Sequence, residues 1–424
     1  MSNYIGIDLA GSPNKETGVS LLRDNEITEI STLRSDKDII EFVVSRKPTL
    51  TAIDAPLTLP TGKDGTYGSR KCDRILQGMK SRYCCNPNFS PFSPTLIAPL
   101  MLRGYHLKKR LKDNGISDII EIHPGTTIEF LDLSITKKDR RYWSMEDWRL
   151  LYLNLKNYLR LQRWSDTITP HMIDAVIASL TAKLYNEGRA KDIGDEEGKI
   201  TVPLPVKVSL CLFDMDGTLT EVVSPWEYLH RKFSLWDGKG EVYLDRYLSH
   251  KISYEQFVEF DTSLWQGKRR SEIEEALDEI PFVEGLEETF KRLRNDGIKI
   301  AILSTGFSYL GKRIKRKVGI DDIRVYANEL MYDESDWFKG VKINVSNDPD
   351  SKRGKKDLVR EICNEIKTSP VNTVAIGDGS SDKEMFESCG LSILFNDRGT
   401  KDIEVDYHIK GGNLTSILKC LPRS

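Results

Sequence analysis

The second half of the chain alternates short apolar strands with amphipathic helices, and this alternation restricts the fold more than any other feature. Strands are predicted at 207–213, 298–303, 373–376 and 391–394. Helical periodicity extends over much of 225–280 and over 285–295, 309–318 and 356–366. Such alternation favours an α/β fold with a doubly wound parallel sheet, in which ligands bind at the carboxyl ends of the strands.

The first half also has the pattern of an α/β domain, with its strands placed early and its helices late. Apolar strands are predicted at 4–8, 18–22 and 49–54. Helices are predicted around 148–161 and 169–184. This order suits an α/β domain that folds separately from the second half.

A boundary between the two halves is predicted near residue 204. The polar stretch 186–198 is followed by Pro203, Pro205 and a new apolar run. Domains are therefore expected at 1–203 and 204–424, with formal net charges of +3 and −5 that together give the stated −2. We find no internal repeat or low-complexity tract.

The composition predicts a globular chain, and we expect it to be cytoplasmic. Hydrophobic residues make up 39% and charged residues 30% of the 424 positions, which suffices for packed cores. There is no apolar run of about 18 residues and no signal-peptide pattern at the start, so we expect no membrane segment. The seven cysteines include no CxxC pair, which argues against a disulfide framework or a zinc site.

Polar side chains gather at predicted strand ends in the second half. Asp214 and Asp216 follow the strand at 207–213, and a second pair follows the strand at 373–376: Asp378 and Asp382. A hard cation such as Mg²⁺ would draw these carboxylates together. Another strand ends in Ser304, Thr305 and Gly306. A hydroxyl and backbone N–H groups at a helix start can hold a phosphate group.

These motifs, with Lys355 at the start of another helix, resemble the haloacid dehalogenase (HAD) phosphatase superfamily over about 207–410. The resemblance implies Asp214 as a nucleophile that forms an aspartyl-phosphate, and Asp216 as the general acid and base. Ser304 and Lys355 would then hold the phosphoryl oxygens, together with Thr305 and Gly306. The implied magnesium site consists of Asp214, the Asp216 carbonyl and Asp378, with Asp382 in support.

The long segment between Thr218 and Ser304 predicts a helical cap at about 222–284. Cap and core together most resemble the phosphoserine phosphatase branch. That branch holds the substrate amine with a glutamate, where this chain has Val223, and the substrate carboxylate with an arginine, which aligns with Asp261. Phosphoserine is therefore a doubtful substrate. Six cap aromatics could stack on a ligand or form cap core: Trp226, Trp236, Trp265, Tyr228, Tyr243 and Tyr247.

The first half carries a second set of acids. Asp8 and Asp54 end predicted strands, and Asp174 lies on a largely apolar helix, one turn after His171. Glu121 lies in another apolar segment. Such acids are costly unless they are paired with hydrogen bonds or metal. Two Mg²⁺ or Mn²⁺ ions would explain them and would suit phosphodiester cleavage; an inactive scaffold with capping aspartates is the alternative.

These short motifs resemble the RNase H-like superfamily, in particular the Holliday-junction resolvase-like members and the DUF429 type of predicted nuclease. The resemblance implies an RNase H-like α/β domain over nearly all of 1–203. The stretch 63–112 adds 11 Lys and Arg against two acids, with interleaved aromatics. This stretch is either a nucleic-acid contact surface or a solvated face.

The leading hypothesis is a Mg²⁺-dependent phosphomonoesterase fused to a nuclease-like domain, acting in nucleic-acid end processing. One alternative is a small-molecule metabolic phosphatase of the phosphoserine phosphatase type with a non-catalytic first domain. A third hypothesis makes the first domain a nucleic-acid binding module without cleavage. A phosphorylated substrate is expected in every case, and a membrane partner in none.

Overall fold

The computed structural model describes residues 2–60, 70–79, 98–133, 140–346, 351, 353–396 and 403–422. The chain forms two compact units, Met1–Lys207 and Val208–Ser424, which we call the N-terminal and the C-terminal unit. The expected boundary lay four residues earlier. Both units are built from mixed helices and strands, so the α/β fold class is confirmed.

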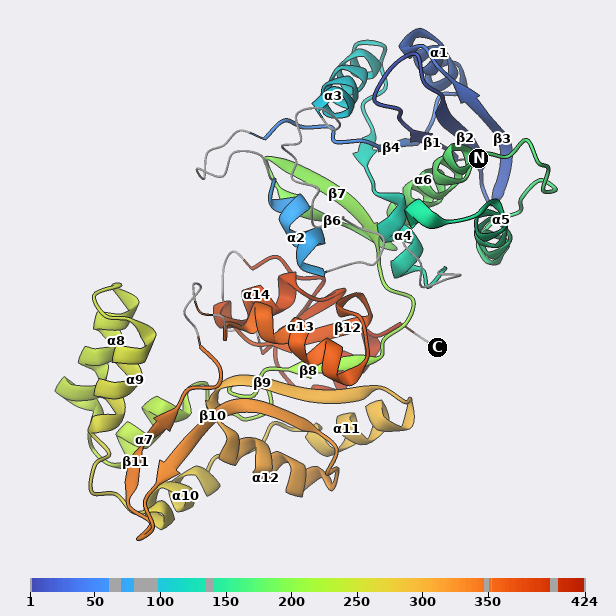
Figure 1. The fold of residues 1–424 in the computed structure, drawn as a ribbon. Helices are drawn as coiled ribbons and strands as arrows, with labels where there is room; N and C mark the ends of the chain where they lie inside the picture. The colour runs from blue at the N-terminus through green and yellow to red at the C-terminus, as the bar shows by residue number, and fades with distance from the viewer. Residues whose placement is uncertain are drawn as a thin grey trace. The chain divides into compact units, whose positions relative to one another are not determined.

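The described part of the N-terminal unit contains a five-stranded sheet in the order β3-β2-β1-β4-β5 (Figure 1). Its strands are β1 (Asn3–Asp8), β2 (Thr17–Arg23), β3 (Glu26–Leu33), β4 (Leu50–Asp54) and β5 (Ile119–Glu121). Strand β2 runs antiparallel to β1 and β3, whereas β4 is parallel to both β1 and β5. A separate antiparallel hairpin follows: β6 (Ala190–Asp195) and β7 (Gly198–Pro203).

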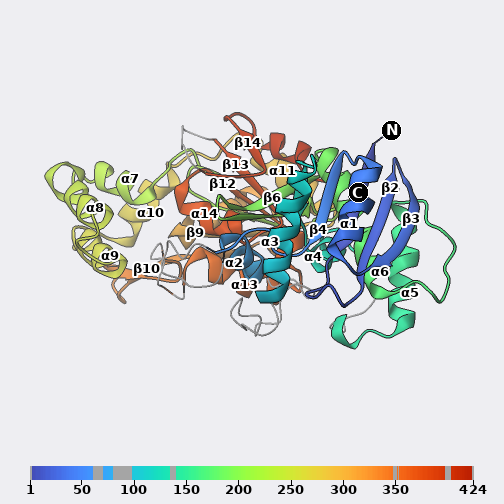
Figure 2. The ribbon, with the colours of Figure 1, turned by 90° about the horizontal axis from the view of Figure 1, so that it is seen from above.

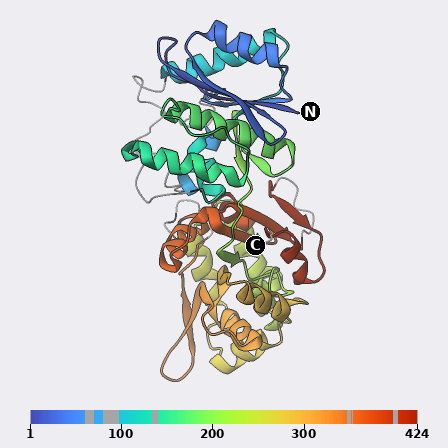
Figure 3. The same ribbon diagram turned by 90° about the vertical axis from the view of Figure 1, so that its right-hand side faces the viewer.

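Helices cover both faces of this sheet (Figure 3). One apolar core lies between the sheet and two helices, α1 (Asp36–Arg46) and α3 (Ala98–Asp113). A second core lies under α4 (Pro124–Phe130), α5 (Met145–Asn154) and α6 (Pro170–Asn186). The remaining elements are α2 (Lys71–Met79) and 3₁₀ turns at Arg140–Tyr142 and Leu155–Asn157.

The helix expected at 148–161 ends earlier than its periodicity predicts. Helix α5 stops at Asn154 and a single 3₁₀ turn continues to Asn157. The chain then becomes extended at Arg160, whose carbonyl accepts a hydrogen bond from the Ile27 N–H beside β3 (3.0 Å). This pairing with the start of β3 competes with further helix, so the prediction was wrong beyond residue 157.

Helix α6 packs unusually close to β1 and β2. A Cβ added to Gly6 would lie 1.9 Å from the Ala175 carbonyl oxygen, so a side chain at that position would displace the helix. The Ser20 hydroxyl donates to the same carbonyl (2.8 Å). Thr169 caps the helix by accepting the Met172 N–H, and Pro170 fits the first turn. The close packing holds the first turns of α6 over the end of β1.

The C-terminal unit has a seven-stranded sheet, counted over its described residues, in the order β11-β10-β9-β8-β12-β13-β14. The strands are β8 (Leu210–Phe213), β9 (Lys299–Phe307), β10 (Arg324–Tyr332), β11 (Phe338–Lys342), β12 (Thr373–Gly377), β13 (Leu391–Phe395) and β14 (Tyr407–Ile409). All neighbouring pairs are parallel except β10 with the edge strand β11. The predicted doubly wound parallel sheet is confirmed.

Helices lie on both faces of this sheet as well (Figure 1). Leu212 and Ala375 face a core shared with α13 (Lys355–Ile366) and α14 (Lys383–Glu387). On the other face, Phe213 packs against Phe290 of α11 (Leu286–Asn295), which lies next to α12 (Ser308–Val318). The strand ends between these layers carry the polar motifs.

Between β8 and β9 the chain forms a helical cap (Figure 2). Its helices are α7 (Pro225–Lys232), α8 (Glu241–Leu248), α9 (Tyr254–Ser263) and α10 (Arg270–Asp278). Trp265 is fully buried in the cap and packs beside Trp226, and Tyr247 stacks on Phe257. These contacts favour the cap-core interpretation of the aromatic set. Every helix in the described ranges is too short or too polar to cross a bilayer.

The close approach of α6 gives a stability prediction. Gly6→Ala should destabilise the N-terminal unit by about 1–3 kcal/mol, because its methyl group must displace Ala175 of α6. Gly11→Ala is the matched control, since its added Cβ would meet nothing nearer than 3.7 Å. Calorimetric melting of the full chain should show a lower Tm for the first variant by about 2–4 °C per kcal/mol. Equal melting of the two variants would contradict the packing described here.

Candidate functional site

The central strands of the C-terminal sheet bring the polar motifs to one edge. Strands β9, β8 and β12 are adjacent and parallel, so their carboxyl ends lie together. Asp214 directly follows β8, Asp378 follows β12, and Ser304 lies near the end of β9. All three residues are buried. The structure thus joins motifs that are separated by more than 150 residues in the chain.

Lys355 connects two of the carboxylates. Its Nζ lies 2.6 Å from Asp214 Oδ1 and 2.6 Å from Asp382 Oδ1, and its side chain is only 2% exposed. Burial disfavours the charged ammonium, but the two carboxylates outweigh it and raise the pKa of Lys355. The site therefore contains a fixed positive charge beside Asp214.

Asp214 and Asp216 both have raised pKa values. Burial, followed by the charge of Asp382, raises the pKa of Asp214 to about 7, although Lys355 lowers it. Burial and the charge of Asp214 raise the pKa of Asp216 well above its usual range. A raised pKa favours the protonated form of Asp216, which is the form that can donate a proton. The contact with Lys355 favours the ionised form of Asp214, which is the form that a nucleophile requires.

Ser304 lies between Asp216 and the backbone of the next loop. Its hydroxyl donates to Asp216 Oδ2 (2.8 Å) and accepts the Gly306 N–H (2.8 Å). The other oxygen of Asp216, Oδ1, is buried and has no hydrogen-bond partner among the described residues. A buried acceptor without a partner is costly, and a bound ligand or ion would satisfy it.

Carboxylate oxygens of Asp214, Asp378 and Asp382 all lie within 4.8 Å of one another, as a metal-ion site requires. Asp382 is already engaged, because its Oδ1 meets Lys355 and its Oδ2 accepts the N–H groups of Asp378 and Gly379. Asp214 and Asp378 are thus the better placed ligands. These oxygen donors fit a hard cation such as Mg²⁺.

Gly217 leaves the space in which the Asp378 carboxylate lies. A Cβ added to Gly217 would lie 2.1 Å from Asp378 Oδ2, and the glycine has a φ of +81°. Both the space and the backbone conformation exclude a side chain here. The chain therefore keeps room for a carboxylate at the position where a metal ligand is expected.

Sequence reasoning considered Trp226 only as a ligand-stacking or cap-core aromatic and assigned no site role to Asn328, yet both contact the Ser304–Gly306 loop. The Thr305 carbonyl accepts Trp226 Nε1–H (3.2 Å) and the Asn328 amide (2.8 Å). Asn328 is fully buried and also accepts the Val345 N–H (2.9 Å). A tryptophan at the start of a cap helix was a signal for the first contact, but the pattern alone did not distinguish it from core.

Asp261 is buried inside the cap. Its side chain is 2% exposed, and its Oδ2 lies 2.8 Å from His230 Nε2. His230 Nδ1 in turn accepts Trp265 Nε1–H (3.1 Å), which leaves the histidine proton on Nε2, facing the carboxylate. The alignment puts Asp261 at the position of an arginine that binds a substrate carboxylate, and in the structure Asp261 has a buried partner, His230, on another cap helix.

The N-terminal unit brings four of its five predicted site residues together. Asp8 and Asp54 are register partners at the ends of the parallel strands β1 and β4. His171 and Asp174 lie on the first turns of α6, and His171 Nδ1 is 2.6 Å from Asp8 Oδ2. Asp174 binds the Arg140 guanidinium through both oxygens. Sequence reasoning missed Arg140, which lies in a polar segment without periodicity.

Charge repulsion marks this acidic cluster. Burial, Asp8 and Asp174 raise the pKa of Asp54 well above its usual range. Burial raises the pKa of Asp174 to about 6, although Arg140 opposes the shift. The hydrogen bond that His171 donates to the Asp8 carboxylate raises the pKa of His171. Among the described residues, the Asp54 carboxylate has no hydrogen-bond or ion-pair partner, and the charge of Arg140 opposes only part of the shift in its pKa.

Glu121 does not join the cluster. Its two oxygens accept from the Arg70 guanidinium at 2.6 and 2.8 Å, and Oε2 also accepts the Leu57 N–H (2.7 Å). Arg70 is 3% exposed, so this is a buried ion pair that fastens the start of α2 to β5. No three acids of the described N-terminal residues bring their oxygens within 4.8 Å of one another. The metal site expected at Asp8, Asp54, Glu121, His171 and Asp174 therefore stays a prediction.

The basic stretch 63–112 lies partly outside the described residues, which exclude 61–69 and 80–97. Two of its arginines are not surface charges. Arg70 pairs with Glu121, and Arg103 binds Asp36 together with the carbonyls of Ala10 and Ser12. These two residues hold the fold together and are not available for contacts with nucleic acid.

Two different protein families match the two halves of the chain. The family model of haloacid dehalogenase-like hydrolases matches residues 211–387, and that of a protein family of unknown function, DUF429, matches residues 6–198. A phosphoserine phosphatase of Archaeoglobus fulgidus is 30% identical over 212 residues, which cover 50% of this chain and 59% of that protein. A phosphoserine phosphatase of Methanocaldococcus jannaschii is 30% identical over 213 residues, which cover 50% of this chain and 97% of that protein.

A solved structure described as a phospho-aspartyl intermediate analogue of phosphoserine phosphatase is 28% identical, with a TM-score of 0.44, and covers 51% of this chain and 99% of that one. The motifs at Asp214, Ser304, Lys355 and Asp378 all lie within residues 211–387, which the family model of haloacid dehalogenase-like hydrolases matches. Through its C-terminal unit, the chain belongs to the haloacid dehalogenase-like hydrolase family, in the branch of phosphatases that resemble phosphoserine phosphatase.

Proposed function

We propose that the C-terminal unit hydrolyses phosphate monoesters through an aspartyl-phosphate on Asp214, with Mg²⁺ as its cofactor. The observation that carries the proposal is the buried Asp214 carboxylate held 2.6 Å from Lys355 Nζ at the carboxyl end of β8. The relatives named phosphoserine phosphatase support the reaction class. Asp214 and Asp378 would hold the ion, which would neutralise charge on the phosphoryl oxygens.

The reaction would proceed in two displacements. An oxygen of Asp214 attacks phosphorus, the ester P–O bond breaks, and the leaving oxygen takes the proton of Asp216. Asp216, now ionised, then removes a proton from water while that water attacks phosphorus and releases Asp214. Lys355, the Ser304 hydroxyl and the loop N–H groups would bind the phosphoryl oxygens and stabilise their growing charge.

Phosphoserine is not the substrate that this site favours. Val223 stands where the related enzymes are expected to bind the amine, and Asp261 is buried against His230. Val223 offers no anion to a substrate amine, and Asp261 offers no cation to a substrate carboxylate. We propose another monoester, either a nucleic-acid end, as the fusion to the N-terminal unit suggests, or a small metabolite. A panel of phosphorylated metabolites and 5′-, 3′- and 2′-phosphorylated oligonucleotides, with phosphate release as the readout, separates the two.

A second function is proposed for the N-terminal unit, namely binding or cleavage of phosphodiesters at the Asp8, Asp54 and Asp174 cluster. The supporting observation is the Asp54 carboxylate, which has no partner yet lies between two other acids. An acid without a partner beside two other acids lowers the stability of the fold, and such destabilising groups are common at functional sites. His171 binds Asp8 and Arg140 binds Asp174, so this proposal includes no metal-dependent step.

Replacing the nucleophile tests the phosphatase. Asp214→Asn should lower phosphate release by at least about 10³-fold and abolish the acid-stable phosphoenzyme seen by mass spectrometry after rapid quenching. Asp216→Asn should lose about 10²–10⁴-fold with alkyl phosphates but much less with an activated aryl phosphate, whose leaving group needs no proton. Unchanged turnover in Asp214→Asn, or equal losses of Asp216→Asn on both substrates, would refute these roles.

Two neighbouring glycines test the geometry of the metal site. Gly217→Ala should lower kcat/KM by about 10²-fold or more, because its methyl group must displace the Asp378 carboxylate. Gly379→Ala is the control, since nothing lies within 4 Å of the added Cβ and the backbone there is extended. Its kinetics should stay close to wild type. Magnesium titrations of activity should show weaker apparent Mg²⁺ affinity only in Gly217→Ala.

Asp54→Asn should stabilise the N-terminal unit. The folded pKa of Asp54 lies above its unfolded value near 3.8, so ionisation opposes folding increasingly as pH rises from about 4 toward the folded pKa. The amide does not ionise. The Tm of the variant should therefore exceed that of wild type at pH 8, and the difference should vanish near pH 4. Asp166→Asn, an exposed position, should show no such trend; a flat difference across pH would contradict the prediction.

A further inference from the structure

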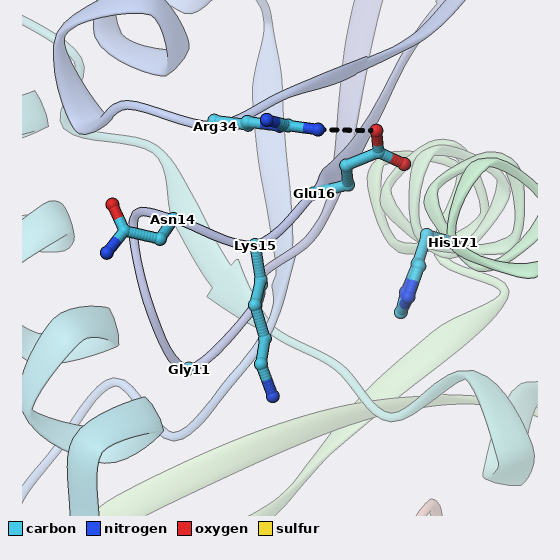
Figure 4. Close-up of a pocket in the computed structure, with 7 residues that line it drawn as sticks. Gly11, Asn14, Lys15, Glu16, Arg34 and His171 are labelled. Atoms are coloured by element: carbon cyan, nitrogen blue, oxygen red, sulfur yellow. Dashed lines mark hydrogen bonds and ion pairs between the residues drawn. The ribbon is translucent and has the colours of Figure 1, made fainter.

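A pocket of about 550 Å³ lies beside the acidic cluster of the N-terminal unit (Figure 4). It is lined by the loop between β1 and β2, by one residue that follows β3 and by one on α6: Ala10, Gly11, Asn14, Lys15, Glu16, Arg34 and His171. A volume of this size is typical of small-molecule sites, which range over about 300–1,000 Å³. The pocket is therefore large enough for a ligand of nucleotide size.

The loop that forms one wall is held in place by its own contacts. The Ala10 N–H donates to Thr17 Oγ1 (3.1 Å), and the Lys15 N–H closes a turn on the Ser12 carbonyl (3.0 Å). The buried Arg103 guanidinium binds the carbonyls of Ala10 and Ser12 from behind. A loop fixed in this way presents its side chains without a large ordering cost on binding.

The positive groups of the pocket are unequally available. Figure 4 shows the Lys15 and His171 side chains extending in the same direction, whereas Arg34 is turned toward Glu16, 3.3 Å away. Among the described residues, Lys15 Nζ has no hydrogen-bond or ion-pair partner. His171 is fixed through Nδ1 by Asp8, and this hydrogen bond raises the pKa of His171. The imidazolium form, which the raised pKa favours, has an Nε2–H that can donate to a ligand on the exposed side of the ring.

The acids near the pocket wall are paired with other side chains and do not neutralise the positive charge of Lys15. Glu16 is engaged by Arg34, and Asp8 by His171. Lys15 is thus a cation without an ion-pair partner among the described residues, and it lines the same pocket as the His171 imidazole. A phosphate group carries negative charge and several acceptor oxygens, and it matches both groups.

We propose that this pocket binds a small phosphorylated ligand, with its phosphate between Lys15 Nζ and His171 Nε2. The ligand is a phosphate ester of nucleotide size rather than a nucleic-acid strand, because the described residues at the pocket wall offer one cation without a partner instead of a track of cations. The site is separate from the phosphatase site of the C-terminal unit and does not depend on it.

Calorimetric titration of the full chain with AMP and with inorganic phosphate tests the proposal, with EDTA present to prevent hydrolysis. Lys15→Gln should weaken AMP binding by about 10- to 100-fold, as expected for one charge-assisted hydrogen bond. Lys199→Gln, an exposed lysine of the same unit outside the pocket, should bind like wild type. Lys15→Arg should recover part of the affinity, and adenosine, which lacks the phosphate, should not bind.

Phosphate release in Mg²⁺ serves as the second readout and should be the same in all these variants, so a failure of the pocket is distinguished from a failure of the phosphatase. Any AMP bound at the C-terminal site contributes equally to each protein. Equal AMP affinity of Lys15→Gln and wild type would overturn the proposal, as would the absence of binding to wild type. If an oligonucleotide without terminal phosphates bound more tightly than AMP, and if this binding depended on Lys15, the ligand of the pocket would be a nucleic-acid strand and the proposal would be overturned.

Discussion

Lys355 holds two buried carboxylates together, and the phosphatase site depends on this contact. Asp214 and Asp382 repel each other in an environment that screens charge poorly, and the ammonium 2.6 Å from each offsets that repulsion. Asp382 also accepts two N–H groups from the loop after β12. One lysine thereby ties the start of α13 to the loops that follow β8 and β12. The reacting carboxylate is consequently fixed before any substrate arrives.

The strand-end motifs show how much of the C-terminal site could be predicted from sequence. Acids and a serine that follow short apolar strands must converge if the strands are parallel neighbours, and β9, β8 and β12 are such neighbours. The pairing of His230 with Asp261 could not be predicted in the same way. Each is one polar residue on an amphipathic cap helix, and only the packing of α7 against α9 reveals that they are partners.

The N-terminal unit shows a similar limit. The rule that a buried acid needs a partner correctly singled out Asp8, Asp174 and Glu121, but it does not say whether the partner is a metal ion or a cationic side chain. The structure supplies His171, Arg140 and Arg70, and two of these three come from segments without helical or strand periodicity. Among the described residues, Asp54 is the acid of this set that has no hydrogen-bond or ion-pair partner, as the sequence predicted for all of them. Because the other acids are paired with side chains, Asp54 is the residue that points to a function.

The Thr305 carbonyl has a consequence for the loop that would receive a phosphate. It accepts from both Trp226 and Asn328, and it belongs to the same peptide group as the Gly306 N–H that meets Ser304. The two ends of a trans peptide group point in opposite directions, so anchoring the oxygen aims the nitrogen. The indole of Trp226 and the amide of Asn328 therefore fix the orientation of this peptide group through its oxygen. The N–H at the other end of the same peptide group then orients the Ser304 hydroxyl.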